Sequence, residues 1–434
     1  MRKKRLLMMA FILLSLSFIA KILSMFIKIL LARLLTKDAM TLYSLAVPTM
    51  LFFITIAQLG LPSTISRIVA DQSIARRRPI IAAILIATIN NLLLVVLLFL
   101  CIPLLSSLLF SSPDMKEVLY AIIPLLPLVT VSGMLKGYYN GKARHIASSA
   151  SSVIEEIARI LFLMIILSIY PIQDSIDLAV ISMLSISAGE VGTILFLTIF
   201  LPFSSKKITV LFTHTTKQAL KYVLSIALPL SAARFTGTLT MFLEPLIIAW
   251  IGVEILPILQ ESYGELHGYI LPLISLSAFL SFSLSTYLLP TFTRYYTNGN
   301  IHQAKILLKH VCILCISIAS CVALTIYMFP QELCVLLYHK TLSNTSLNAV
   351  RWMVFPFAIG SIQSVLSVCL TALDQTHLSF IDSLIGSILR LLCLILLIPI
   401  FREYALFISL LAGYLLTTFL HALRLHHAFL KSNM

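Results

Sequence analysis

The sequence predicts an all-α, polytopic membrane protein with about twelve transmembrane helices, and three observations lead to this class. The 434 residues are 59% hydrophobic and only 11% charged, against roughly 25% in ordinary soluble domains. The mean hydropathy is +1.03. Apolar segments long enough to cross a bilayer alternate with short polar connections. The net charge of +14 is typical of basic loops at a membrane surface, so we expect no nucleic-acid partner.

Hydropathy places the spans in order along the chain, and prolines interrupt several of them. Pro48 and Pro62 fall in the second span, and Pro124 and Pro127 in the fourth. Proline is tolerated in a spanning helix where neighbours satisfy the freed carbonyls. The expected spans are 6–33, 42–66, 79–110, 117–139, 150–170, 177–201, 220–250, 266–290, 303–329, 350–373, 378–400 and 403–425.

The first span carries a polar stripe. Ser17, Lys21, Ser24 and Lys28 recur at spacings of four, three and four, which places them on one helical face. A cation inside hydrocarbon is costly, so such a face normally turns toward a water-filled cavity or a partner charge. The alternative is snorkelling, in which each ammonium reaches the headgroups. Since Lys21 lies deeper than Lys28, it snorkels less easily.

Spans five and six also carry ionisable residues. Glu155 precedes Arg159 by four residues, the favourable order for a helical ion pair, and this pair either faces a cavity or neutralises itself for packing. Glu190 lies between Gly189 and Gly192, where it is either a proton carrier or a packed, protonated carboxyl. We therefore treat Glu155 and Glu190 as candidates for ion or proton coupling.

Span seven places Arg234 on a polar face and Glu244 immediately before Pro245. The carboxylate and the carbonyls freed by the proline predict a cation or proton site, with a structural Arg–Glu contact as the alternative. Span eleven contains Arg390. Its surroundings, Ile388-Leu-Arg390-Leu-Leu, resemble Ile157-Ala-Arg159-Ile-Leu in span five, six spans earlier.

These matches predict two six-helix bundles related by a parallel repeat around a central cavity, because an even number of spans separates the paired sequences. We expect an N-terminal bundle at 1–202, a cytoplasmic linker at 203–219 and a C-terminal bundle at 220–434. The basic clusters at 2–5, 76–78 and 206–207 fall on one side of the predicted topology. By the positive-inside rule, both termini are then cytoplasmic.

Several functions are disfavoured by what the sequence lacks. It has no G-x-x-x-x-G-K-[ST] phosphate loop, no H-E-x-x-H motif and no outer loop long enough for a catalytic domain. Cys312 and Cys315 form a C-x-x-C without a second ligand pair, which favours helix packing over a metal site. We therefore expect a transporter rather than an enzyme, with no catalytic residues, metal or cofactor. A cationic cavity would favour an anionic cargo.

Three motifs resemble the stage V sporulation protein B family, which belongs to the multidrug/oligosaccharidyl-lipid/polysaccharide exporter superfamily. The motifs are Leu59-Gly-Leu-Pro-Ser-Thr-Ile-Ser-Arg67, Gly137-Tyr-Tyr-Asn-Gly141 and Ser151-Ser-Val-Ile-Glu-Glu-Ile-Ala-Arg159. Asn140 stands where that family usually has glutamine. The remaining matched stretches are 17–23, 30–35, 42–48, 242–245, 263–268 and 271–272.

The resemblance implies alternating access and movement of an undecaprenyl-diphosphate-linked glycan from the inner to the outer leaflet of a bacterial plasma membrane. It implies that Lys21, Lys28 and Arg234 hold the diphosphate, with Arg67 at the inner mouth and Arg159 in the same cationic cavity. The implied partners are the lipid-linked glycan, membrane lipids, a coupling proton or sodium ion, and cell-wall synthesis proteins. Many relatives carry fourteen spans against the twelve expected here, a departure that puts lipid II itself in doubt as the cargo.

Three alternatives stay open at this stage. A multidrug or organic-cation antiporter of the same superfamily would favour acidic and aromatic cavity residues, which the intramembrane cations oppose. A non-transporting scaffold for cell-wall or spore-coat assembly would need its intramembrane charges only for packing. A membrane glycosyltransferase or polymerase is disfavoured by the short outer loops.

Overall fold

A computed structural model describes residues 2–71, 77–110, 114–169, 174–199, 214–276, 281, 288, 292–296 and 298–431. Within these ranges the chain is helical and contains no strand. Internal contacts divide it into two compact units, Met1–Phe242 and Leu243–Met434. Each unit is described by itself.

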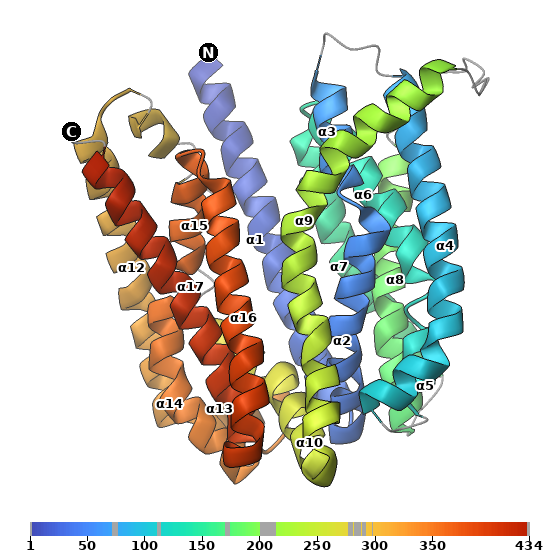
Figure 1. The fold of residues 1–434 in the computed structure, drawn as a ribbon, viewed down its shortest axis with the longest axis vertical. Coiled ribbons are helices and arrows are strands. Elements are labelled where there is room, and N and C mark those ends of the chain that lie inside the picture. The colour runs from blue at the N-terminus through green and yellow to red at the C-terminus, as the bar shows by residue number, and fades with distance from the viewer. Residues whose placement is uncertain are drawn as a thin grey trace. The chain divides into compact units, whose positions relative to one another are not determined.

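The first unit contains the helices coloured blue to yellow-green in Figure 1. Its last helix, α9, begins at His214 and continues past Phe242 into the second unit. The helices are α1 (Arg2–Leu34), α2 (Lys37–Gln58), α3 (Leu61–Ala70), α4 (Arg77–Phe110), α5 (Met115–Tyr120), α6 (Leu125–Gly141), α7 (His145–Ile169), α8 (Ser175–Ile199) and α9 (His214–Ile251).

The second span is broken into α2 and α3 by two residues in the left-handed region. Leu59 has φ 44° and Gly60 has φ 67°. A Cβ at Gly60 would lie 2.6 Å from the carbonyl oxygen of Ala227 in α9. Glycine is required here because the backbone conformation and the close approach of α9 both exclude a side chain. Pro62 then occupies the first turn of α3, where its missing N–H costs no hydrogen bond.

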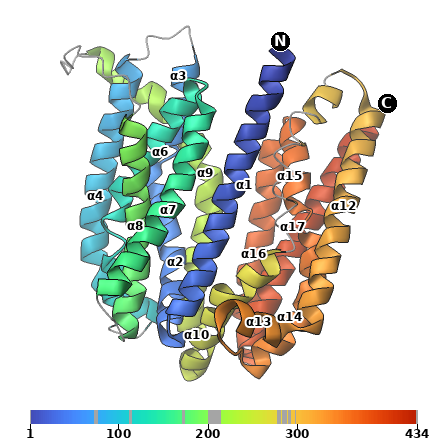
Figure 2. The same cartoon turned by 180° about the vertical axis from the view of Figure 1, so that it is seen from behind.

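α6 is the central helix of the first unit, packed against α2, α3, α7 and α8. Gly133, Gly137 and Gly141 recur every four residues and face α3. A Cβ at Gly137 would overlap the Pro62 carbonyl oxygen, so the two backbones touch. Small residues at this spacing allow close helix packing in membranes. On another side of the unit, α1 lies along α7 and α7 along α8 (Figure 2).

α9 is bent by 48° between Lys217–Ala232 and Arg234–Ile251. Pro229 lies one turn before the bend, and proline removes a hydrogen bond of the helical ladder. The part before the bend packs Ala219, Val223 and Ala227 into a core with α3 and α4.

The second unit continues from α9 with the helices coloured yellow to red in Figure 1. α17 is its central helix and packs against α14, α15 and α16. The elements are the short helix η1 (Val253–Ile255), α10 (Leu256–Glu265), the π-helical turn η2 (Leu266–Ile270), α12 (Ile301–Met328), α13 (Pro330–Tyr338), α14 (Asn344–Gly360), α15 (Gln363–Ala372), α16 (Thr376–Phe401) and α17 (Tyr404–Lys431).

The two units share a packing detail that supports the parallel repeat. In the first, Gly189 of α8 faces Arg159 of α7, and a Cβ there would lie 2.6 Å from the arginine Cγ. In the second, Gly413 of α17 faces Arg390 of α16, and a Cβ at Gly413 would lie 2.9 Å from the arginine Cβ. In both units, therefore, an arginine stem crosses a glycine on the following span. The fourth span of each half is also broken, into α5 and α6 and into α14 and α15.

The helix count agrees with about twelve spans. Nine stretches of the described chain are long and apolar enough to cross a membrane, or ten if bent α9 is one span. α7 is 25 residues long but is not among the nine, because it contains three charged residues, Glu155, Glu156 and Arg159. The expected span at 266–290 lies partly outside the described residues, as does most of the expected linker at 203–219. The bundle boundaries stay a prediction, while the compact units divide within α9, at Phe242.

Candidate functional site

The polar stripe of α1 lies on the surface of the first unit. Ser17, Lys21 and Lys28 are exposed and Ser24 is half-buried, whereas Ile27 is buried on the neighbouring face. The charged groups close enough to influence Lys28 are Lys21, Arg159 and Glu156. The predicted stripe therefore forms a helix surface on which two lysines are accessible.

Arg159 joins this stripe through α7. Its Nη1 donates to Oε2 of Glu156 at 3.2 Å, and its guanidinium also hydrogen-bonds Tyr43 of α2. Glu156 in turn accepts a hydrogen bond from the Ser24 hydroxyl of α1. We call Lys21, Ser24, Lys28, Glu156 and Arg159 the α1–α7 cluster. It combines three cations with one carboxylate, so its field favours an anionic ligand.

The predicted helical pair of Glu155 with Arg159 is wrong. Glu155 instead accepts from Nζ of Lys136 of α6 at 2.6 Å, and Glu156, three residues before Arg159, takes the arginine. The spacing of four suits an ion pair on an isolated helix. Here Lys136 of α6 pairs with Glu155, and Glu156 is the partner of Arg159 within α7. Glu155 is thus in an ion pair that links two helices.

Glu190 of α8 is buried, with 6% of its surface exposed. The hydroxyl of Ser132 of α6 donates to its Oε2. The flanking glycines let α7 approach closely, since a Cβ at Gly192 would lie 2.7 Å from the Cβ of Ala158. Glu155 and Glu244 have basic partners, whereas the hydrogen bond resolved at Glu190 comes from a neutral hydroxyl. The role of Glu190 in coupling stays a prediction.

Arg67 and Arg234 belong to helices other than the two that form the α1–α7 cluster. Arg67 is exposed near the end of α3. Arg234 is exposed on α9, beside Phe235, whose ring is 5.5 Å from that of Phe52 of α2. The structure therefore places Arg234 where α9 packs on α2, and its grouping with Lys21 and Lys28 around a central cavity stays a prediction.

Glu244 of α9 pairs with Arg390 of α16 inside the second unit. Nη2 of Arg390 donates to Oε2 of Glu244 at 2.7 Å, and Nε lies 2.5 Å from Oε1. The Glu244 side chain is only 4% exposed. Arg390 also lines a pocket of about 290 Å³, with hydroxyl groups from Ser383, Ser387 and Thr417. The sequence matched Arg390 to Arg159 but did not mark it as a site residue.

A second buried network in this unit was missed by sequence reasoning. Asp382 of α16 is fully buried and accepts from Nε of Arg424 at 2.6 Å. Nδ1 of His421 lies 3.2 Å from the same carboxylate, and its Nε2 lies 3.1 Å from Oγ of Ser379. An ionisable residue within an apolar span is the signal that identifies such groups. The network joins α16 to α17.

Comparison with known proteins places this arrangement in a family. Residues 6–296, more than half of the chain, match the polysaccharide biosynthesis protein family. The chain belongs to this family. It is also 26% identical to stage V sporulation protein B of Bacillus subtilis (strain 168), over 97% of this chain and 84% of that protein. The resemblance seen in the sequence motifs is therefore confirmed.

Solved structures show the same fold. An inward-facing multidrug resistance MATE family transporter of the MOP superfamily matches with a TM-score of 0.75 and 15% identity, over 98% of this chain and 99% of that one. The lipid II flippase MurJ, in an inward closed conformation, matches with a TM-score of 0.70 and 15% identity, over 97% and 90%. This family member is therefore a multi-pass membrane protein with a transporter fold.

Proposed function

We propose that this chain is a flippase that moves a lipid-linked, anionic glycan precursor from the inner to the outer leaflet by alternating access. The observation that carries the proposal is the α1–α7 cluster, in which Lys21 and Lys28 are exposed beside Arg159 in a member of the polysaccharide biosynthesis family. Lysine and arginine are natural partners of phosphate oxygens, since each hydrogen bond is charge-assisted. The cargo that fits this chemistry is an undecaprenyl-diphosphate-linked sugar.

Glu190 is our choice for the coupling group, with the membrane potential or an ion gradient as the driving force. It is buried and bonded to a hydroxyl, so gaining or losing a proton breaks no ion pair. Glu155 and Glu244, by contrast, lie in ion pairs with Lys136 and Arg390. In this proposal the protein acts in a bacterial plasma membrane with both termini cytoplasmic, alongside cell-wall synthesis proteins.

An organic-cation antiporter is the second candidate, favoured by aromatic rings in the first unit. The ring of Phe52 stacks on that of Phe242 at 4.6 Å and lies 5.5 Å from that of Phe235. Aromatic faces bind cations. The exposed lysines of α1 oppose this reading.

The test is transfer of a labelled undecaprenyl-diphosphate sugar between the leaflets of vesicles that contain the purified protein. The Lys21→Gln and Lys28→Gln variants should each slow transfer about tenfold or more, because a charge-assisted hydrogen bond contributes about 1.5–3 kcal/mol. Lys116→Gln is the matched control, since it removes an exposed lysine from α5. Arg234→Gln tests whether α9 contributes to the same site.

Two results would count against parts of the proposal. If the wild type transfers the lipid and the three test variants transfer it at the same rate as the Lys116→Gln control, the chain is a flippase but the α1–α7 cluster is not its site. No transfer of any lipid-linked glycan, together with proton-driven uptake of an organic cation, would replace the flippase with the antiporter. Absence of both activities would favour the scaffold.

A further inference from the structure

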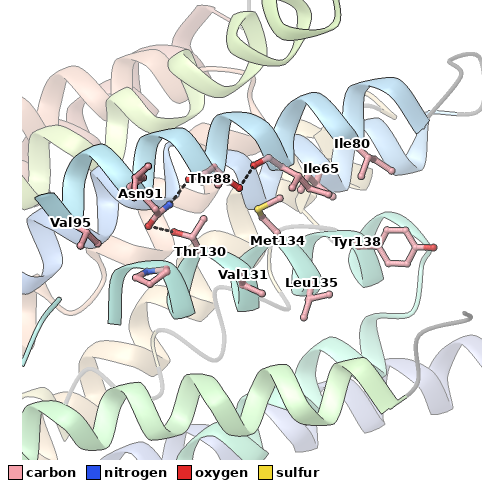
Figure 3. Close-up of a pocket in the computed structure, with 14 residues that line it drawn as sticks. Ile65, Ile80, Thr88, Asn91, Val95, Thr130, Val131, Met134, Leu135 and Tyr138 are labelled. Atoms are coloured by element: carbon pink, nitrogen blue, oxygen red, sulfur yellow. Dashed lines mark hydrogen bonds between the residues drawn. The ribbon is translucent and has the colours of Figure 1, made fainter. Parts of the chain in front are cut away.

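The first unit contains a long groove between α4 and α6 that the proposed function does not use. Its volume is about 630 Å³. Figure 3 shows Ile80 and Val95 near its two ends on α4, with Val131 and Tyr138 on α6. The 16 residues from Ile80 to Val95, with 15 rises between them, correspond to about 22 Å of helix. This length is a large part of the roughly 30 Å hydrocarbon core of a bilayer.

The groove is apolar because the polar side chains along its middle are already hydrogen-bonded within the protein. Nδ2 of Asn91 donates to the carbonyl of Ala57 at 3.2 Å and to that of Ala87 at 2.9 Å. Its Oδ1 accepts from Thr130 (Figure 3). α2 ends at Gln58, so the Ala57 carbonyl is one of those left without a helical partner. The asparagine thus donates a hydrogen bond to a carbonyl at the end of α2, and apolar side chains face the groove.

The groove lies on the side of α6 that faces away from its close contact with α3. Gly133, Gly137 and Gly141 place α6 directly on the α3 backbone, and the opposite side of α6 faces α4 across the groove. Its rim is open to the outside of the unit, since Leu92 is 65% exposed and Val131 is 46% exposed. Both helices belong to membrane spans, so hydrocarbon chains surround this opening.

Basic side chains stand at one end of the groove. Lys142 follows α6, and its Nζ lies 5.8 Å from the centre of the Tyr138 ring, which lines that end. Arg78 is exposed two residues before Ile80 on α4, and Arg67 is exposed two residues after Ile65 on α3. A basic pocket between spanning helices binds lipid phosphate. Apolar walls with a cationic end are complementary to an anionic lipid.

We propose that the α4–α6 groove is a binding site for an anionic glycerophospholipid of the bilayer, with an acyl chain along Ile80–Val95 and the phosphate against Lys142 and Arg78. The occupant is a resident lipid rather than the transported one. α1 and α4 lie on opposite sides of α7 and α8 (Figure 2), so a cargo diphosphate at the α1–α7 cluster would be far from this groove. The site therefore stands independently of the proposed function.

The test is native mass spectrometry of the full-length protein, titrated with phosphatidylglycerol or phosphatidylethanolamine. We expect about tenfold preference for phosphatidylglycerol. Val131→Trp fills the groove and should lower its binding about tenfold. Val96→Trp is the matched control, because Val96 is an exposed valine of α4 outside the groove. Thr88→Leu is a milder filling variant should Val131→Trp fail to fold. Lys142→Gln with Arg78→Gln should remove the preference while both lipids still bind.

Three outcomes would overturn the proposal. Equal binding of the two phospholipids would reject the basic end as a phosphate site. Equal lipid content in the well-folded Val96→Trp variant and a well-folded groove-filling variant would reject the groove. Displacement of phosphatidylglycerol by undecaprenyl phosphate at lower concentration, abolished by Val131→Trp or Thr88→Leu, would assign the groove to the cargo instead.

Discussion

At the residue scale, the ionisable side chains within the spans differ chiefly in their partners. Glu155, Glu156 and Glu244 each have a basic partner, whereas a serine hydroxyl donates to Glu190. Inside a membrane an ionised group without a partner is expensive. The partners therefore distinguish Glu190 from the three carboxylates that lie in ion pairs.

The Glu244–Arg390 pair allows a prediction at this scale. Arg390→Gln leaves the buried Glu244 carboxylate without its cation, and breaking a buried pair costs about 3–5 kcal/mol. We expect Arg390→Gln to lower the thermal unfolding temperature in detergent more than Glu244→Gln with Arg390→Gln, because the double variant contains no stranded charge. If the single and double variants unfold at the same temperature, the pair does not stabilise the second unit.

At the element scale, the break between α2 and α3 requires glycine at one of its two left-handed positions. Gly60 has φ 67° and lies against the backbone of α9, whereas Gly237 lies within α9 with open space around its Cα. Gly60→Ala should destabilise the protein by about 1–3 kcal/mol through backbone strain, with the contact against Ala227 adding to it. Gly237→Ala should be neutral or stabilising, because alanine has the higher helix propensity.

Chemical unfolding in detergent checks this contrast between the two alanine variants. A Gly60→Ala protein as stable as the wild type would show that neither the left-handed backbone at residue 60 nor the approach of α9 requires glycine there. Gly237→Ala is the internal control, since it makes the same chemical change elsewhere in the first unit.

Helix positions were largely predictable at the element scale, and their breaks only in part. The expected span at 6–33 corresponds to α1, and that at 378–400 to α16. The span at 42–66 was expected from its prolines to be interrupted, but the structure breaks it at Leu59 and Gly60. Proline at the start of a helix only marks the new helix, so the break itself comes from the left-handed residues before it.

At the scale of the whole molecule, the coupling assignment predicts a separation of two activities. Glu190→Gln holds this position neutral and still accepts a hydrogen bond from Ser132. We expect downhill exchange of the labelled lipid-linked sugar to continue, while uphill transfer driven by a proton gradient is lost. Transfer is measured in vesicles with and without an imposed gradient. Gradient-driven transfer at wild-type rates in Glu190→Gln would reject Glu190 as the proton carrier.

The sequence alone determined the class and order of the elements. A bilayer offers no hydrogen-bond partners, so each crossing must satisfy its own backbone, and the resulting apolar runs can be read locally. The stripe of α1 was predicted for the same reason, since four residues of one helix share a face whatever surrounds them. The correspondence of Arg159 with Arg390 was also visible as a sequence match.

Only the tertiary structure decided the partners of the charges. Lys136 and Glu155 are 19 residues apart, Ser132 and Glu190 are 58 apart, and Glu244 and Arg390 are 146 apart. Helical periodicity relates residues three or four apart and contains no information on which helix lies alongside. Glycines at helix contacts set those neighbours by letting backbones touch, and the resulting approach of α6 to α3 also opened the groove beside α4.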